Sequence, residues 1–139
     1  MTQKDKELLL KDLCARLPYG VKILHEGWNF EWDDELSTVE KVVGIDKDFI
    51  YTKVINTHNG EEYRNDKYPI DTFDDKLFLR PMSSMTDEEK LMYEGLMIGI
   101  DNISYMLDVI DWLNSHHFDY RGLIQKGLAL EALDGMYNK

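Results

Sequence analysis

The first run of apolar residues has the spacing of an amphipathic helix. Within 4–17, leucines recur every three or four positions with charged residues between them, and Pro18 and Gly20 follow at once. We therefore expect an N-terminal helix that ends near residue 17. Cys14 shares the leucine stripe, which predicts a buried, unreactive thiol rather than a nucleophile.

From Val21 onward the pattern changes to alternation, which is typical of strands with one buried face. Segments 38–45 and 49–56 are rich in Val, Ile, Phe and Tyr, and Asp46-Lys47-Asp48 separates them, so we expect an antiparallel hairpin. Asn59-Gly60 fits a type I′ turn, with positive φ at both residues, and predicts another short strand after it. Leu77-Phe78-Leu79 is expected to plug the end of this small β-meander.

Helical spacing returns near position 80. Thr86 and Glu89 have the spacing of a capping box, which predicts the start of a helix. Gly95 and Gly99 weaken that helix and indicate a break, a close helix contact or a dimer contact. A second helix is expected after Asp101 or Asn102.

This second helix has the clearest apolar stripe in the chain. Its members are Ile103, Leu107, Ile110 and Asn114, flanked by Met106 and Leu113. Asp119 could then cap a short last helix over 120–126. The spacing of apolar residues changes from two to about four near position 80, which predicts a layer of strands covered on one face by the later helices.

Together these patterns predict an α+β fold: an N-terminal helix, an antiparallel sheet of three to five strands that could curl into an SH3-like barrel, and two or three C-terminal helices. The 139 residues are expected to form a single domain. Within it, 1–80 hold the helix and sheet, and 81–139 form a helical subdomain.

Charge and composition narrow the functional classes. The 27 acidic residues outnumber the 16 basic ones, and the resulting net charge of −11 disfavours direct nucleic-acid binding. One cysteine excludes a disulfide within the chain and a multi-cysteine zinc site. Neither an apolar secretory core nor a membrane-length apolar run is present, so we expect a soluble cytoplasmic protein without a membrane partner.

Two groups of residues are candidates for chemistry or binding. His116, His117 and Asp119 could hold a metal or relay a proton, assisted by His25, His58 or Asp108, but adjacent helical histidines diverge, and packing at a helix end is the favoured interpretation. Asp33-Asp34-Glu35 and Asp74-Asp75 lack the ligand spacing of a calcium loop. No cofactor is expected.

The aromatic residues Trp28, Phe30 and Trp32 alternate, so in an extended segment their rings would project to one side. One interpretation is that the rings pack over the core or an edge of the sheet. The other is that they form a partner-binding patch together with Tyr120 and Arg121. The methionines at 82, 85, 92, 97 and 106 are interpreted as adaptable filling between sheet and helices.

Three stretches carry a resemblance to a known family: Asp12 to Val21, Leu79 to Thr86, and Asp111 to Ile124, the last followed by Gly127 to Ala132. They resemble small uncharacterised proteins encoded by gut anaerobes and by their phages or prophages. The resemblance implies a mobile-element origin and a helix, sheet, helix order. It implies no activity, cofactor or catalytic residue.

The leading hypothesis is a non-enzymatic accessory protein that binds another protein. The sequence leaves open which protein it binds and what oligomeric state the chain itself adopts. One variant is an acidic mimic of DNA that occupies the groove of a basic protein. The alternative is a small metal-dependent enzyme that uses His116, His117 and Asp119.

Overall fold

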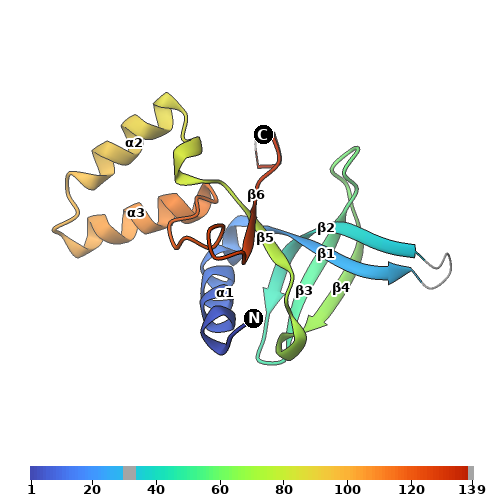
Figure 1. Ribbon diagram of the computed structural model, residues 1–139. Coiled ribbons are helices and arrows are strands. Elements are labelled where there is room, and N and C mark those ends of the chain that lie inside the picture. The colour runs from blue at the N-terminus through green and yellow to red at the C-terminus, as the bar shows by residue number, and fades with distance from the viewer. Residues whose placement is uncertain (30–33, 138–139) are drawn as a thin grey trace.

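A computed structural model describes residues 1–29 and 34–137, with the backbone alone for residues 28, 29 and 34–36. The fold is α+β (Figure 1). Helix α1 (Gln3–Arg16) precedes a sheet built from β1 (Lys22–Asn29), β2 (Asp34–Ile45), β3 (Phe49–Ile55), β4 (Glu62–Pro69), β5 (Lys76–Leu79) and β6 (Ala129–Glu131). Helices α2 (Asp87–Met97) and α3 (Ile103–Ser115) lie between β5 and β6 in the chain. Short 3-10 turns occupy Leu17–Tyr19, Ile70–Thr72 and Met82–Ser84.

The described strands form one open sheet in the order β4-β3-β2-β1-β5-β6. All neighbours are antiparallel except β5 and β6, which pair in parallel. A parallel pair needs a long crossover, and the α2–α3 segment supplies it. The expected SH3-like barrel is therefore wrong, because the strand order is linear and β4 and β6 remain edges.

Two further predictions, for residues 77–79 and 120–126, are wrong. Leu77-Phe78-Leu79 is not a plug but most of β5, which pairs with β1 on one side and with β6 on the other. The segment 120–126 forms turns rather than a third helix. Asp119 caps these turns, since its carboxylate accepts hydrogen bonds from the backbone N–H groups of Leu123 and Ile124, both at 2.9 Å.

The main core lies between α1 and one face of the sheet. Leu9 and Leu13 of α1 pack with buried side chains from β1, β2, β3 and β5. Cys14 is exposed, so the prediction of a buried thiol is wrong. The inward face of α1 is rotated toward Asp12 and Arg16, which have no exposed surface. Their ion pair at 2.8 Å offsets part of the cost of burying the two charges.

The predicted hairpin is confirmed as β2 and β3, joined at Asp46-Lys47-Asp48. The turn after β3 differs from the type I′ prediction. Gly60 has φ of +75°, but Asn59 is not among the described residues with positive φ. Instead the backbone N–H of Gly60 donates to the Asn56 carbonyl at 2.7 Å, and β4 runs to Pro69.

Candidate binding surface

Helix α2 starts at the predicted capping box. The Thr86 hydroxyl accepts from the Glu89 backbone N–H at 3.1 Å, and the Glu89 carboxylate accepts from the Thr86 N–H at 2.9 Å. Arg80 donates two further hydrogen bonds to Glu89, at 2.6 and 2.8 Å. These Arg80 bonds are the largest cause that lowers the pKa of Glu89 to about 2. The start of α2 is thus tied to the end of β5.

A second, smaller core holds α2 against α3. Val109 and Leu113 of α3 pack with Phe118, and Leu96 of α2 joins them from its partly buried position. The Tyr93 ring stacks on Trp112 with 6.2 Å between ring centroids. The helices form an antiparallel pair that projects away from the sheet (Figure 1), so α1, not the later helices, covers the main core.

The turn between the two helices explains one of the two glycines. A Cβ on Gly99 would lie 2.8 Å from Cδ2 of Tyr105 in α3, closer than van der Waals contact allows. The expected break at this position is confirmed, because α2 ends at Met97 and Asn102 caps α3 by accepting from the Ser104 N–H. Gly99 is therefore needed for close contact within the chain.

We expect Gly99→Ala to lower the free energy of unfolding by about 1–3 kcal/mol, since Tyr105 must move to admit the methyl group. Urea unfolding followed by circular dichroism measures the change. Gly95→Ala is the matched control, because a Cβ on Gly95 would meet no described atom within 4 Å. Equal effects of the two substitutions would contradict the assigned role of Gly99.

Most of the surface of the α2–α3 hairpin is uncovered. Within 87–97, all of which the structure describes, no residue is buried. The buried residues of α3 lie toward its C-terminal end, at Val109, Leu113 and Asn114. Large apolar side chains lie exposed on the rest of the hairpin: Leu91, Met92, Met97, Ile98, Ile103, Tyr105, Met106 and Leu107.

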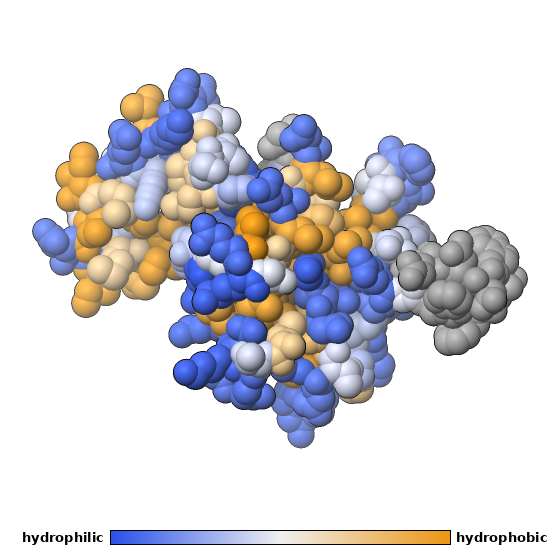
Figure 2. All heavy atoms as spheres, in the orientation of Figure 1, coloured by the Kyte–Doolittle hydropathy of each residue, from blue (hydrophilic) through white to orange (hydrophobic). Residues whose placement is uncertain are grey.

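The exposure of this set is high. Ile98 is 87% exposed, Ile103 74% and Leu91 71%. Figure 2 shows hydrophobic side chains gathered over the two helices, on the part of the molecule farthest from the sheet. Grouped exposure of this kind marks interaction surfaces, whereas single exposed apolar residues do not. We call the eight side chains the hairpin surface.

The charges around the hairpin surface are almost all negative. Between 87 and 115 the chain has one basic residue, Lys90. The acidic residues of this segment are Asp87, Glu88, Glu89, Glu94, Asp101, Asp108 and Asp111. The exposed apolar side chains therefore lie among predominantly acidic charges, which we call the acidic surround.

The predicted cluster of His116, His117 and Asp119 does not converge. His117 is buried in a left-handed conformation with φ of 60°, and its ring stacks on Tyr137 with 3.7 Å between centroids. His116 Nδ1 lies 2.9 Å from the Trp112 carbonyl oxygen, and Asp119 caps the following turn. Among the described residues no three His, Cys, Asp or Glu side chains are placed to hold a metal ion.

The pKa of His117 is strongly lowered, to about 3. Burial is the main cause, because it disfavours the charged imidazolium, and the cationic Arg16 and Lys22 nearby act in the same direction. His117 is therefore neutral at physiological pH and packs as an aromatic ring.

The structure describes the side chains of only some of the predicted partner-binding residues, and those make contacts within the chain. Phe30 and Trp32 lie outside the described residues, and of Trp28 only the backbone is described, paired with Glu35. Arg121 Nε donates to the buried Asp12 carboxylate at 3.1 Å. The Tyr120 hydroxyl donates to Asn114 at 2.8 Å. Arg121 thus joins the C-terminal segment to α1, and Tyr120 joins it to α3.

A polar cluster on the sheet was missed by the sequence reasoning. His25 Nδ1 lies 2.7 Å from an Asp75 carboxylate oxygen, and the His25 ring stacks on Tyr68 with 4.2 Å between centroids. The Tyr68 hydroxyl donates at 2.7 Å to Glu40, which has no exposed surface and also accepts from two threonine hydroxyls. Burial raises the pKa of Asp75, against the opposing effect of His25.

This cluster joins β1, β2, β3, β4 and the residue before β5. His25 lies on the same face of β1 as the buried Ile23, but the sequence has no signal that brings Asp75 and Tyr68 to it. A His–Asp pair can transfer protons, yet both threonine hydroxyls of the cluster donate their hydrogen bonds to Glu40. The geometry supports a structural network that satisfies a buried carboxylate.

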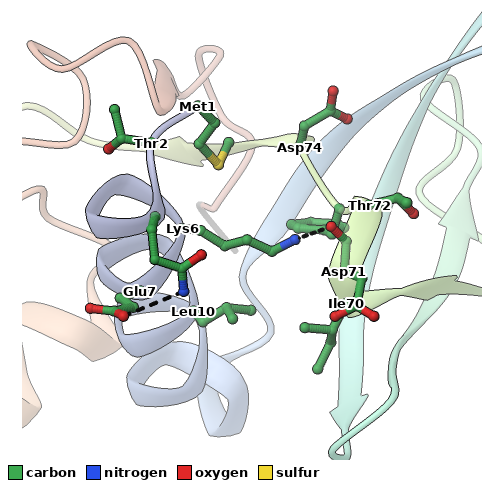
Figure 3. Close-up of a pocket in the computed structure, with 11 residues that line it drawn as sticks. Met1, Thr2, Lys6, Glu7, Leu10, Ile70, Asp71, Thr72 and Asp74 are labelled. Atoms are coloured by element: carbon green, nitrogen blue, oxygen red, sulfur yellow. Dashed lines mark hydrogen bonds between the residues drawn. The ribbon is translucent and has the colours of Figure 1, made fainter.

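A cleft of about 460 Å³ lies between the start of α1 and the connection from β4 to β5 (Figure 3). Lys6 crosses it and donates to the Asp71 carbonyl, while Gln3 bonds to Glu7 on the same helix. The Lys6 ammonium therefore holds the two walls together. The lining is otherwise a mixture of polar, acidic and apolar side chains.

Comparison with protein-family models, with curated proteins and with solved structures finds no match. Within the described residues, no helix has the length and apolar character needed to cross a bilayer. Function is therefore inferred from the surface of the molecule itself.

Proposed function

We propose that the protein is a non-enzymatic binding module and that the hairpin surface is where it binds another protein. One observation carries this proposal: the apolar stripe of α3 continues past the point where the rest of the chain stops covering it. Asn114, at the C-terminal end of this stripe, is 4% exposed, whereas Leu107 is 56% and Ile103 74% exposed. An amphipathic helix is stabilised by covering its apolar face, so a partner that covers the remaining half gains hydrophobic burial.

The chemistry of the surface supports a protein as the ligand. Flexible methionines beside Leu, Ile and Tyr suit adaptable contacts with another protein. The acidic surround repels phosphate backbones and anionic lipid headgroups, which disfavours nucleic acid and membrane as occupants. It favours a partner with basic groups around an apolar centre. The origin of the protein in a phage or other mobile element stays a prediction.

Site-specific photocrosslinking in the source cells tests this function. A photoreactive benzophenone side chain at Leu107 is expected to form a covalent adduct with another protein. The matched control carries the same group at Tyr63 of β4, which is equally exposed at 59% but lies on the sheet. We expect no adduct from Tyr63, and we expect Ile103→Asp to abolish the adduct from Leu107, because a charge at the surface opposes apolar contact.

Two outcomes would overturn the proposal. Equal adducts from Leu107 and Tyr63, or none from either, would show that the hairpin surface has no selective partner. An adduct with twice the mass of the chain would show that the hairpin surface binds a second copy of this chain and not a different protein. Ile103 is 74% exposed, so its substitution is expected to leave the unfolding midpoint nearly unchanged, and thermal unfolding checks this.

A further inference from the structure

Gly95 lies in the middle of an exposed apolar row on α2. Leu91 and Gly95 lie in α2, and Ile98 is its C-cap residue with right-handed helical backbone angles, so at spacing i, i+4 and i+7 the three share one face. Both large neighbours are highly exposed, at 71% and 87%. The glycine therefore forms a notch between two apolar side chains.

Nothing described within the chain requires a glycine there. A Cβ on Gly95 would meet no described atom within 4 Å, and Gly95 is not among the glycines with positive φ. Glycine inside a helix is less stable than alanine, because it loses more backbone freedom on folding. Gly99, in contrast, is explained by its contact with Tyr105. A glycine without an internal role between two exposed apolar residues fits the close approach of a backbone from outside.

The charges beside this row indicate what kind of backbone approaches. Asp87, Glu88 and Glu94 flank the row, and Lys90 is the one basic residue of α2. A second copy of the chain would bring like charges together, which disfavours self-association. A partner with lysines or arginines on either side of an apolar stripe would meet opposite charges.

We infer that the row Leu91–Gly95–Ile98 binds an amphipathic helix with basic residues flanking its apolar face, and that this helix crosses α2 at Gly95. The inference rests on the proposed function, since it names the partner of the same hairpin surface. The apolar side chains of the partner contact Leu91 and Ile98, and its backbone approaches at the notch. Acidic residues of α2 and basic residues of the partner fix its orientation.

Binding of a synthetic peptide tests the inference with the full chain. The probe is a fluorescently labelled peptide of about 18 residues, with leucines at helical spacing and lysines around them, a length of about 27 Å as a helix. Fluorescence anisotropy measures its affinity for the wild type, Gly95→Ala and Leu91→Ala. A peptide with glutamate in place of every lysine is the charge control.

We expect Gly95→Ala to weaken lysine-peptide binding about tenfold or more, because the methyl group fills the notch. The same substitution is expected to raise the unfolding midpoint, which separates lost binding from lost folding. Leu91→Ala is expected to weaken binding and leave the midpoint nearly unchanged. The glutamate peptide is expected not to bind, and affinity for the lysine peptide is expected to fall as salt is added.

The outcomes separate this inference from the proposed function. If Gly95→Ala binds the lysine peptide as tightly as the wild type while Leu91→Ala binds it weakly, the peptide does not cross α2 at Gly95, but the hairpin surface is still the binding site. If the lysine and glutamate peptides bind equally, the partner does not need basic residues and this part of the inference is wrong. If the lysine peptide does not bind but Leu107 still forms a selective crosslink, the partner class is wrong and the proposed function stands. A dimer in light scattering that Gly95→Ala dissociates would assign the row to a second copy.

Discussion

Arg16→Met is expected to lower the free energy of unfolding by about 3–5 kcal/mol, because it leaves a buried carboxylate without its main partner. Arg16 and Asp12 have no exposed surface and are joined by two hydrogen bonds at 2.8 and 3.2 Å. Arg16 also donates to the Phe118 carbonyl at 2.6 Å. Methionine fills similar space but supplies none of these donors. Urea unfolding followed by circular dichroism measures the loss.

Two further variants test the physical cause. Arg16→Lys keeps the charge but not the planar fork, so we expect an intermediate loss. The double variant Asp12→Leu/Arg16→Met removes both charges, and we expect it to be more stable than Arg16→Met alone, since an apolar pair carries no desolvation cost. A double variant less stable than Arg16→Met would contradict this explanation. Where Arg16→Met does not fold, Arg16→Lys still measures the effect.

Acidification from pH 7 to pH 4 is expected to destabilise the protein through His117. The pKa of this histidine is lowered to about 3 in the folded state, whereas the ordinary value is 6.5. The unfolded chain therefore binds a proton before the folded chain does. Stability is fully present above about pH 6.5 and is lost as the pH falls toward 3. With about 1.4 kcal/mol for each pH unit, His117 contributes a loss of about 3 kcal/mol by pH 4.

His117→Asn is the control for this titration. Asparagine tolerates the left-handed backbone of this position and has no proton to gain. We expect the variant to be less stable at pH 7, since the stacking on Tyr137 is lost, but to have a shallower dependence on pH between 7 and 5. Glu89 titrates below this interval, because its pKa is lowered. Parallel curves for the wild type and the variant would contradict the role of His117.

Local signals predicted the elements whose determinants lie close in the sequence. The capping box at Thr86 and Glu89 and the Asn102 cap are local hydrogen bonds, so residue types predicted the first and narrowed the second to Asp101 or Asn102. The β2–β3 hairpin likewise depends on alternation and a short turn. The same reasoning failed for Cys14, because it placed every charged residue of α1 outside. It did not account for Asp12 and Arg16 neutralising each other four residues apart in the core.

The candidate site was only partly accessible to sequence reasoning. The stripe through Ile103 and Leu107 was recognised, but such a stripe predicts burial and does not say by what. The glycines were left open between a helix break, a close contact and a dimer contact. The structure separates them, because a Cβ on Gly99 would collide with Tyr105 and one on Gly95 would face open space.

Periodicity, caps and composition were enough to predict the α+β class, the order of helix, sheet and helices, and an excess of acidic residues. The tertiary structure alone decided which apolar residues are covered. The return of β6 to pair with β5 is a contact across about fifty residues, and it leaves the α2–α3 hairpin outside the sheet. Whether an apolar side chain is covered depends on which distant segments pack against it, so a local sequence pattern cannot predict it. The hairpin side chains are exposed because no described distant segment packs against them.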